Sequence, residues 1–210
     1  MDKINWLFFD MGSTLIDETQ SYMGWFRSAS QLIGGALSAE EIEKAYCAGM
    51  IKGNPTIAGQ LNAYGFTGNS TNHLYPSELD IPYPEAEKVL DQLFRTYKLG
   101  IIANQNAGSE LRLKQYCLRQ YFDVIVASAE AGVKKPDPRI FRLALEQANC
   151  EPEQAAMIGD RLDNDIFPAN ALGFTTVRIL QGYGRLQVPK SAEYEPDFTV
   201  DTLMQLLNIF

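Results

Sequence analysis

The sequence predicts an α/β fold in which a parallel sheet is covered by helices on both faces. Two observations support this fold class. Short apolar runs such as Trp6-Leu7-Phe8-Phe9 are typical of strands buried on both faces. These runs alternate with segments whose apolar residues recur every three or four positions, as in amphipathic helices. We therefore expect a doubly wound parallel sheet, with an insert between its first two strands.

The composition is that of a globular protein and excludes several classes of function. The 210 residues are 46% hydrophobic and 21% charged, which is ordinary for such proteins. A net charge of -8 and the lack of a dense Lys/Arg tract argue against nucleic-acid binding. No signal peptide precedes the first strand and no apolar run reaches about 18 residues, so we expect no membrane partner. The three cysteines show no CxxC spacing, which predicts free thiols and a cytoplasmic location.

The first strand ends on Asp10, and a mostly helical insert follows it. Spacings of three and four between apolar residues predict a helix over 19–33. Ser38 and Glu41 form a capping-box pattern that begins a second helix. A third, short helix is expected near 56–64. We interpret residues 16–83 as the insert.

The remaining strands and helices form the rest of the core. Further strands are expected at 101–103, 122–127, 155–158 and 175–180. Helices are expected to begin near Pro84, with Ser109 as an N-cap, after Pro138, near residue 163 and near Asp201. The core domain, Rossmann-like in topology, would comprise residues 1–15 and 84–210. The insert, residues 16–83, would then stand above the carboxyl ends of the strands as a helical cap.

Polar residues follow four of the predicted buried segments. They are Asp10, Asn104, the Lys134-Lys135 pair, and Asp160 with Asp165. The carboxyl ends of parallel strands share one edge of a sheet, where ligands bind. Neighbouring carboxylates repel unless a cation intervenes, and oxygen ligands suit Mg²⁺. A lysine there would hold an anionic group, and a carboxylate that attacks phosphorus gives an aspartyl-phosphate that water hydrolyses.

Three of these segments resemble motifs of the haloacid dehalogenase superfamily, in its phosphatase-type branch with a helical cap. The first motif stands as Phe8-Phe9-Asp10-Met11-Gly12-Ser13-Thr14-Leu15. The third stands as Gly132-Val133-Lys134-Lys135-Pro136-Asp137-Pro138-Arg139-Ile140-Phe141. The fourth stands as Ile158-Gly159-Asp160-Arg161-Leu162-Asp163-Asn164-Asp165-Ile166. The resemblance extends from residue 5 to about residue 185, and the cap matches only in its placement and helical character.

The resemblance implies a Mg²⁺-dependent hydrolase that acts on a small phosphorylated metabolite. It makes Asp10 the nucleophile and a metal ligand, and Lys135 the group that steadies Asp10 and the phosphoryl group. It makes Asp160 an acidic metal ligand and places Asp165 in support of the metal shell. The main-chain carbonyl of Gly12 would also contact the metal. The substrate-binding positions that it implies are Gly12, Ser13, Ala103, Asn104 and Lys135.

Two positions depart from the family pattern. Gly12 stands where phosphatases carry the aspartate that protonates the leaving oxygen and later activates water. Such acid–base groups typically contribute about a hundred- to ten-thousand-fold to the rate. Ala103 stands where a Ser or Thr hydroxyl binds the phosphoryl group, which leaves the amide of Asn104 as a candidate donor.

Three functions therefore stay open. The first is a working hydrolase whose acid comes from the cap or the substrate, or whose leaving group needs none. The second is a catalytically weak relative that binds a phosphorylated ligand or a protein partner. The third is a phosphonatase- or dehalogenase-like hydrolase, where phosphonate cleavage would need a Schiff-base lysine such as Lys52 in the cap. Retention of Asp10, Lys135 and Asp160 favours the first function.

Overall fold

The computed structural model describes residues 4–53 and 55–210, and the chain divides into two compact units. The core unit comprises Met1–Ile16, Pro82–Arg185 and Pro189–Phe210, and the insert unit comprises Asp17–Ile81 with Leu186–Val188. The long segment of the insert unit begins one residue later and ends two residues earlier than the insert expected from the sequence. Residues 1–3 of the expected core lie outside the described residues. The role of the insert unit as a cap stays a prediction.

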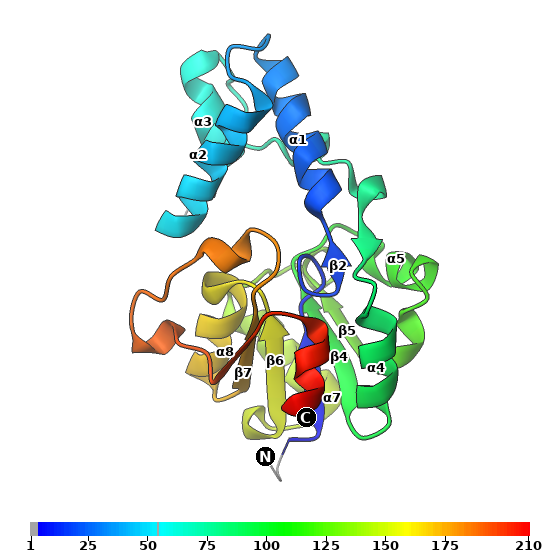
Figure 1. Ribbon diagram of the computed structural model, residues 1–210. Helices are drawn as coiled ribbons and strands as arrows, with labels where there is room; N and C mark the ends of the chain where they lie inside the picture. The colour runs from blue at the N-terminus through cyan, green and yellow to red at the C-terminus, as the bar shows by residue number, and fades with distance from the viewer. Residues whose placement is uncertain (1–3, 54) are drawn as a thin grey trace. The chain divides into compact units, whose positions relative to one another are not determined.

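A six-stranded sheet forms the centre of the core unit (Figure 1). Its order is β5-β4-β1-β6-β7-β8, and each neighbouring pair is parallel. The strands are β1 (Trp6–Phe9), β4 (Lys98–Ala103), β5 (Val124–Ala127), β6 (Ala155–Gly159), β7 (Thr175–Ile179) and β8 (Phe198–Val200). In the centre of the sheet Phe9 lies beside Ile101 of β4 and Ile158 of β6. The expected α/β fold class is confirmed.

The side chains of β1 alternate between two apolar clusters, one on each face of the sheet. Leu7 and Phe9 belong to the first cluster and Phe8 to the second, and all three are fully buried. The first face carries α4 (Ala86–Phe94), α5 (Ser109–Gln115) and the 3₁₀ helix η9 (Leu203–Asn208); the second carries α7 (Pro138–Ala148) and α8 (Phe167–Leu172). Because helices cover both faces, β1 is apolar at every position rather than at alternate ones.

Shorter elements connect the strands and helices of the core. They are α6 (Ser128–Ala131), the π-helical turn η6 (Leu162–Ile166), and the 3₁₀ turns η4 (Arg119–Tyr121), η5 (Pro152–Gln154), η7 (Gly184–Leu186) and η8 (Ala192–Tyr194). The turn η6 runs directly into α8. Together η6 and α8 occupy the place of the helix expected over 163–172.

The insert unit is helical, as its sequence predicted. It contains α1 (Thr19–Leu32), α2 (Ala39–Lys52), α3 (Ile57–Leu61) and the 3₁₀ turns η1 (Asn62–Tyr64), η2 (Asn72–Leu74) and η3 (Ser77–Leu79). The two-stranded ribbon of β2 (Ile16–Asp17) and β3 (Ile81–Pro82) connects it to the core. The capping box of α2 is confirmed, because Glu41 N–H donates to Ser38 Oγ and Ser38 N–H donates to the Glu41 carboxylate. The rings of Tyr22 and Tyr46, 5.7 Å apart, pack α1 against α2.

Three local expectations were wrong. Gly108, with a φ of 91°, takes the N-cap position of α5, so Ser109 is the first helical residue and its hydroxyl donates to Asn106 O. The edge strand β8 was missed because only its pairing with β7 defines its three residues. The final helix is a 3₁₀ helix that begins at Leu203 rather than near Asp201.

The cysteines and the lengths of the helices were also subjects of prediction. Cys47, Cys117 and Cys150 are free thiols, as their spacing predicted. Over the described residues, none of the helices has the length and apolar character needed to cross a bilayer.

Candidate active site

The parallel sheet places Asp10 at its carboxyl edge. Asp10 directly follows β1, and its backbone N–H donates to Ile158 O of β6 over 2.8 Å. The next backbone N–H, that of Met11, donates to Asp10 Oδ1 over 2.7 Å. The chain then turns sharply, since Leu15 N–H and Ile16 N–H both donate to Met11 O. The backbone therefore fixes both the position and the orientation of this carboxylate.

Two further carboxylates lie beside Asp10. Asp160 follows β6 and Asp165 lies in the turn η6, and they are 3% and 0% exposed. Asp10, Asp160 and Asp165 each offer one oxygen atom, and these atoms all lie within 4.8 Å of one another. Three carboxylates at this separation repel one another unless cations or protons intervene.

Lys135 supplies one of the required positive charges. Its Nζ lies 2.8 Å from Asp10 Oδ1 and 2.6 Å from Asp165 Oδ1, and its side chain is 1% exposed. Burial lowers the pKa of Lys135, but the charges of Asp10 and Asp165 outweigh burial and raise that pKa above its ordinary value. Lys135 is therefore a buried ammonium ion at neutral pH, held between two carboxylates.

Asp165 titrates under opposing influences. Burial raises the pKa of its carboxyl group to about 6, although the charge of Lys135 lowers it. Arg161 N–H also donates to Asp165 Oδ2 over 3.0 Å, which favours the ionised form. Above about pH 6 the ionised form of Asp165 prevails, and the ammonium of Lys135 then lies 2.6 Å from a negatively charged carboxylate.

These residues fit a divalent metal ion. The donors are carboxylate oxygens, which suit hard cations such as Mg²⁺. The sequence predicted that Asp10, Asp160 and Asp165 would share a metal site, and the structure brings them together; their binding of a metal stays a prediction.

Asn104 holds the backbone of Lys135 rather than presenting a free amide. Its Oδ1 accepts from Lys135 N–H over 2.7 Å, and its Nδ2 donates to Lys135 O over 2.9 Å. Asn104 directly follows β4, after the buried Ala103. Its predicted part in binding substrate stays a prediction. The clamp on Lys135 joins residues 31 positions apart, so no local sequence signal could have revealed it.

The loop of Gly12 and Ser13 completes the first motif. Gly12 forms an isolated backbone bridge with Ile16, and Ser13 is 5% exposed with a left-handed φ of 53°. Gly12 offers no side-chain acid next to the Asp10 carboxylate. The contacts of Gly12 and Ser13 with a substrate stay predictions.

Two glycines, Gly159 and Gly184, allow the backbone to approach the carboxylates closely. Neither close approach was predicted from the sequence. A Cβ atom at Gly159 would lie 2.5 Å from Asp165 Cγ, and one at Gly184 would lie 2.8 Å from Asp160 Cγ. Arg178 fixes the second glycine by donating from Nη2 to Gly184 O over 3.0 Å. The signal that could have revealed this loop is the Gly182-Tyr183-Gly184 sequence, which is separated by one residue from the strand expected at 175–180.

The sequence is similar to a family of hydrolases and to curated phosphatases. Residues 7–179 match the model of a family described as haloacid dehalogenase-like hydrolase. A glyceraldehyde 3-phosphate phosphatase of Methanopyrus kandleri is 37% identical over 130 residues, which are 61% of this chain and 56% of the relative. The pyrimidine 5'-nucleotidase YjjG of Escherichia coli is 37% identical over 132 residues, which are 62% of this chain and 57% of the relative. The chain thus spans less than two thirds of the length of these relatives.

Solved structures share the fold over nearly the whole chain. The HAD-hydrolase YfnB of Bacillus subtilis, bound to magnesium, aligns with a TM-score of 0.74 at 20% identity, covering 99% of this chain and 98% of that chain. The haloacid dehalogenase-like protein SP0104 of Streptococcus pneumoniae aligns with a TM-score of 0.74 at 21% identity, covering 100% of both chains. At these identities the similarity concerns the fold.

Proposed function

The chain belongs to the haloacid dehalogenase-like hydrolase family, and we propose that it is a Mg²⁺-dependent phosphatase of small phosphorylated metabolites. The observation that carries this proposal is the cluster at the carboxyl edge of the sheet. Lys135 lies between Asp10 and Asp165, and Asp160 is the third carboxylate beside them. A site that only bound a phosphate would gain nothing from an oriented carboxylate, since a carboxylate repels phosphate. As a nucleophile, the same carboxylate has a role.

The proposed reaction proceeds through a covalent intermediate on Asp10. A carboxylate oxygen of Asp10 forms a bond to phosphorus while the bond from phosphorus to the leaving oxygen breaks, and the leaving group departs as its anion, a carboxylate from an acyl phosphate or a phenolate from an aryl phosphate. Water then cleaves the aspartyl-phosphate, which releases inorganic phosphate and restores the carboxylate. The donors Met11 N–H and Lys135 Nζ hold Asp10 Oδ1 in place before substrate arrives. The ammonium of Lys135 also offsets the charge of the phosphoryl group.

A divalent metal ion fits this reaction. Asp10, Asp160 and Asp165 would hold Mg²⁺, together with the carbonyl of Gly12 that the family resemblance implies. When bound, Mg²⁺ would neutralise charge on the phosphoryl oxygens. The relatives named as phosphatases of glyceraldehyde 3-phosphate and nucleotides support small phosphate esters as the substrate class.

Because position 12 is a glycine, the rate of hydrolysis should depend strongly on the leaving group of the substrate. With no carboxylic acid at position 12, substrates whose leaving groups need no proton should react fastest. Aryl phosphates and acyl phosphates are such substrates. A second function, binding of a phosphorylated ligand without turnover, is favoured by the same glycine and by Ala103.

The test is hydrolysis of acetyl phosphate with and without Mg²⁺. We expect Mg²⁺-dependent turnover that Asp10→Asn abolishes and that Asp91→Asn, a change at an exposed carboxylate of α4 paired with Arg95, leaves intact. Turnover that survives Asp10→Asn, or that persists after metal is removed, would refute the proposal. Binding of a phosphorylated ligand with no turnover would favour the second function.

A further inference from the structure

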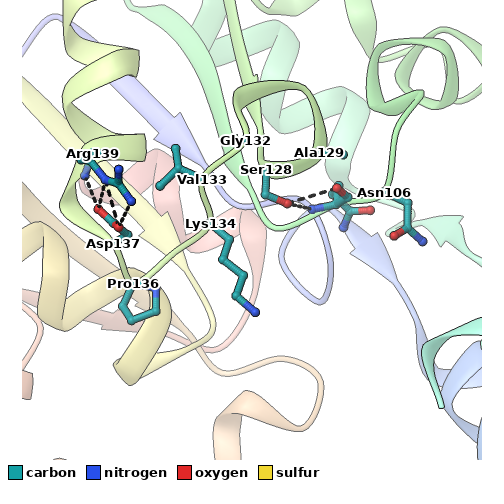
Figure 2. Close-up of a pocket in the computed structure, with 10 residues that line it drawn as sticks. Asn106, Ser128, Ala129, Gly132, Val133, Lys134, Pro136, Asp137 and Arg139 are labelled. Carbon is teal, nitrogen blue, oxygen red and sulfur yellow. Dashed lines mark hydrogen bonds and ion pairs between the residues drawn. The ribbon is translucent and has the colours of Figure 1, made fainter. Parts of the chain in front are cut away.

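One cavity is lined by both chain neighbours of Lys135, which are Lys134 and Pro136, and by none of the three clustered carboxylates. Its volume is about 810 Å³, and it lies within the core unit. Figure 2 shows its lining, which comes from the loop after β4, from α6, from the loop that carries Lys134 and from the first turn of α7. Ligand pockets commonly have volumes of about 300–1,000 Å³. The cavity is therefore large enough for a small ligand or for part of one.

One unpaired cation lines this cavity. Lys134 adjoins Lys135 in the chain, yet Lys135 is buried between carboxylates whereas Lys134 is exposed. Lys134 forms no ion pair with any residue in the described ranges 4–53 and 55–210. In Figure 2 its side chain extends from the loop and carries no dashed line.

The other charges of the lining cancel. Asp137 is the one acidic residue of the lining, and its carboxylate is paired with Arg139 at 2.7 Å through Nη2. Figure 2 shows this pair directed toward each other. Two cations and one carboxylate thus leave the lining with a net charge of one positive unit. Glu130, on the adjacent helix α6, accepts from Gly108 N–H over 2.9 Å.

Side-chain amides add neutral donors to the cavity. Arg112 Nη2 donates to Gln105 Oε1 over 2.6 Å, which turns the NH₂ group of Gln105 away from Arg112. The Gln105 backbone is fixed by a pair of hydrogen bonds with the hydroxyl of Ser128. The side-chain amide of Asn106, which also lines the cavity, donates to no residue that the structure describes. Two amide NH₂ groups and one ammonium are therefore available to a ligand.

From this lining we propose that the cavity binds a carboxylate or phosphate group, through Lys134 Nζ and the side-chain amides of Gln105 and Asn106. An oxyanion accepts from all three donors and neutralises the charge of Lys134. A cationic ligand would meet the uncompensated ammonium, and an apolar one would leave three donors without acceptors. The lining residues adjoin Asn104 and Lys135 in the chain, so the bound oxyanion is either the far end of a substrate or a free anion.

The first test is binding of malonate, followed by the backbone amide signals of Gln105, Asn106 and Lys134 in NMR spectra. We expect saturable shifts with a dissociation constant on the order of 1 mM. Lys134→Ala should weaken binding about tenfold or more, and Lys134→Arg should retain it. Lys88→Ala, which removes an exposed lysine of α4, should change nothing. Binding that is absent, or that Lys134→Ala leaves unchanged, would overturn the proposal.

The second test separates the two sources of the oxyanion and rests on the proposed phosphatase activity. Phenyl phosphate and 4-carboxyphenyl phosphate, which are both aryl phosphates, differ only in a ring hydrogen against a carboxylate. If the cavity holds the far end of the substrate, Lys134→Ala raises KM about tenfold for the carboxylate ester alone. If Lys134→Ala changes KM by the same factor for both substrates and abolishes malonate binding, the ligand is a free anion. Because the NMR test needs no turnover, failure of the phosphatase proposal does not affect it.

Discussion

Replacing Lys135 with methionine should expose how strongly the carboxylate cluster opposes folding. Lys135 is 1% exposed and pairs at 2.6 Å with Asp165, which is fully buried. Removing one partner of a buried ion pair typically costs about 3–5 kcal/mol, because the remaining charge stays buried without compensation. For a domain whose stability is of the order of 5–15 kcal/mol, this is a large fraction.

The assay is urea unfolding of the wild type and of Lys135→Met, with and without Mg²⁺. The matched control is Lys98→Met, whose partner Asp123 lies at 3.3 Å with the lysine side chain 62% exposed; this variant should lose less than about 1 kcal/mol. Adding Asp165→Asn to Lys135→Met should recover most of the loss, since both buried charges are then gone.

Magnesium should act on Lys135→Met more strongly than on the wild type. Lys135 and a metal ion are like charges that face the same carboxylates, so removing the ammonium should tighten Mg²⁺ binding by at least about tenfold. At a hundred times its dissociation constant, Mg²⁺ stabilises the folded state by about 2.7 kcal/mol. A loss no larger than that of Lys98→Met, or weaker Mg²⁺ binding in Lys135→Met, would refute this reasoning.

Three further predictions concern the same cluster. Gly12→Asp should raise kcat about a hundred- to ten-thousand-fold for alkyl phosphates and much less for acetyl phosphate, because only the alkyl leaving group needs an acid. An aspartate can adopt the backbone conformation of Gly12, since its φ lies outside the left-handed region. Equal gains on both substrates would count against a missing acid. Asn104→Ala should lower kcat by about tenfold or more, because it removes both hydrogen bonds to the Lys135 backbone; an unchanged kcat would show that the clamp does not position the lysine. Because burial raises the pKa of Asp165 to about 6, the protonated form of Asp165 prevails below that pH, and the proton competes with the metal for the carboxylate. Calorimetry should therefore show that the Mg²⁺ affinity falls by about tenfold per pH unit below pH 6. A constant affinity from about pH 7 to 5 would contradict this prediction.

The sheet and most of the cluster could be predicted because their signals are local in the sequence. An apolar run that ends on a carboxylate defines β1 and Asp10 without reference to the rest of the chain. The parallel topology then brings Asp10 and Asp160 to one edge, since β1 and β6 are neighbours in register. The capping box of Ser38 and Glu41 is equally local, and it formed as expected.

Features that depend on distant partners could not be predicted. The pairing of the Asn104 side-chain amide with the backbone of Lys135 joins residues 31 positions apart in the chain. The approach of Gly184 to Asp160 depends on how the loop after β7 folds back. The N-cap of α5 fell on Gly108 rather than Ser109 because a glycine with positive φ ends the preceding loop one residue earlier.

The measurement that tests the central claim most directly is the identification of the phosphorylated residue. Protein quenched during turnover of acetyl phosphate with Mg²⁺ would be reduced with borohydride, which converts an aspartyl-phosphate to homoserine, and mapped by mass spectrometry. Because the leaving group of acetyl phosphate needs no proton, Asp10 should be phosphorylated without an acid at position 12, and homoserine should appear at position 10. Turnover with position 10 still aspartate and another residue modified would contradict the account.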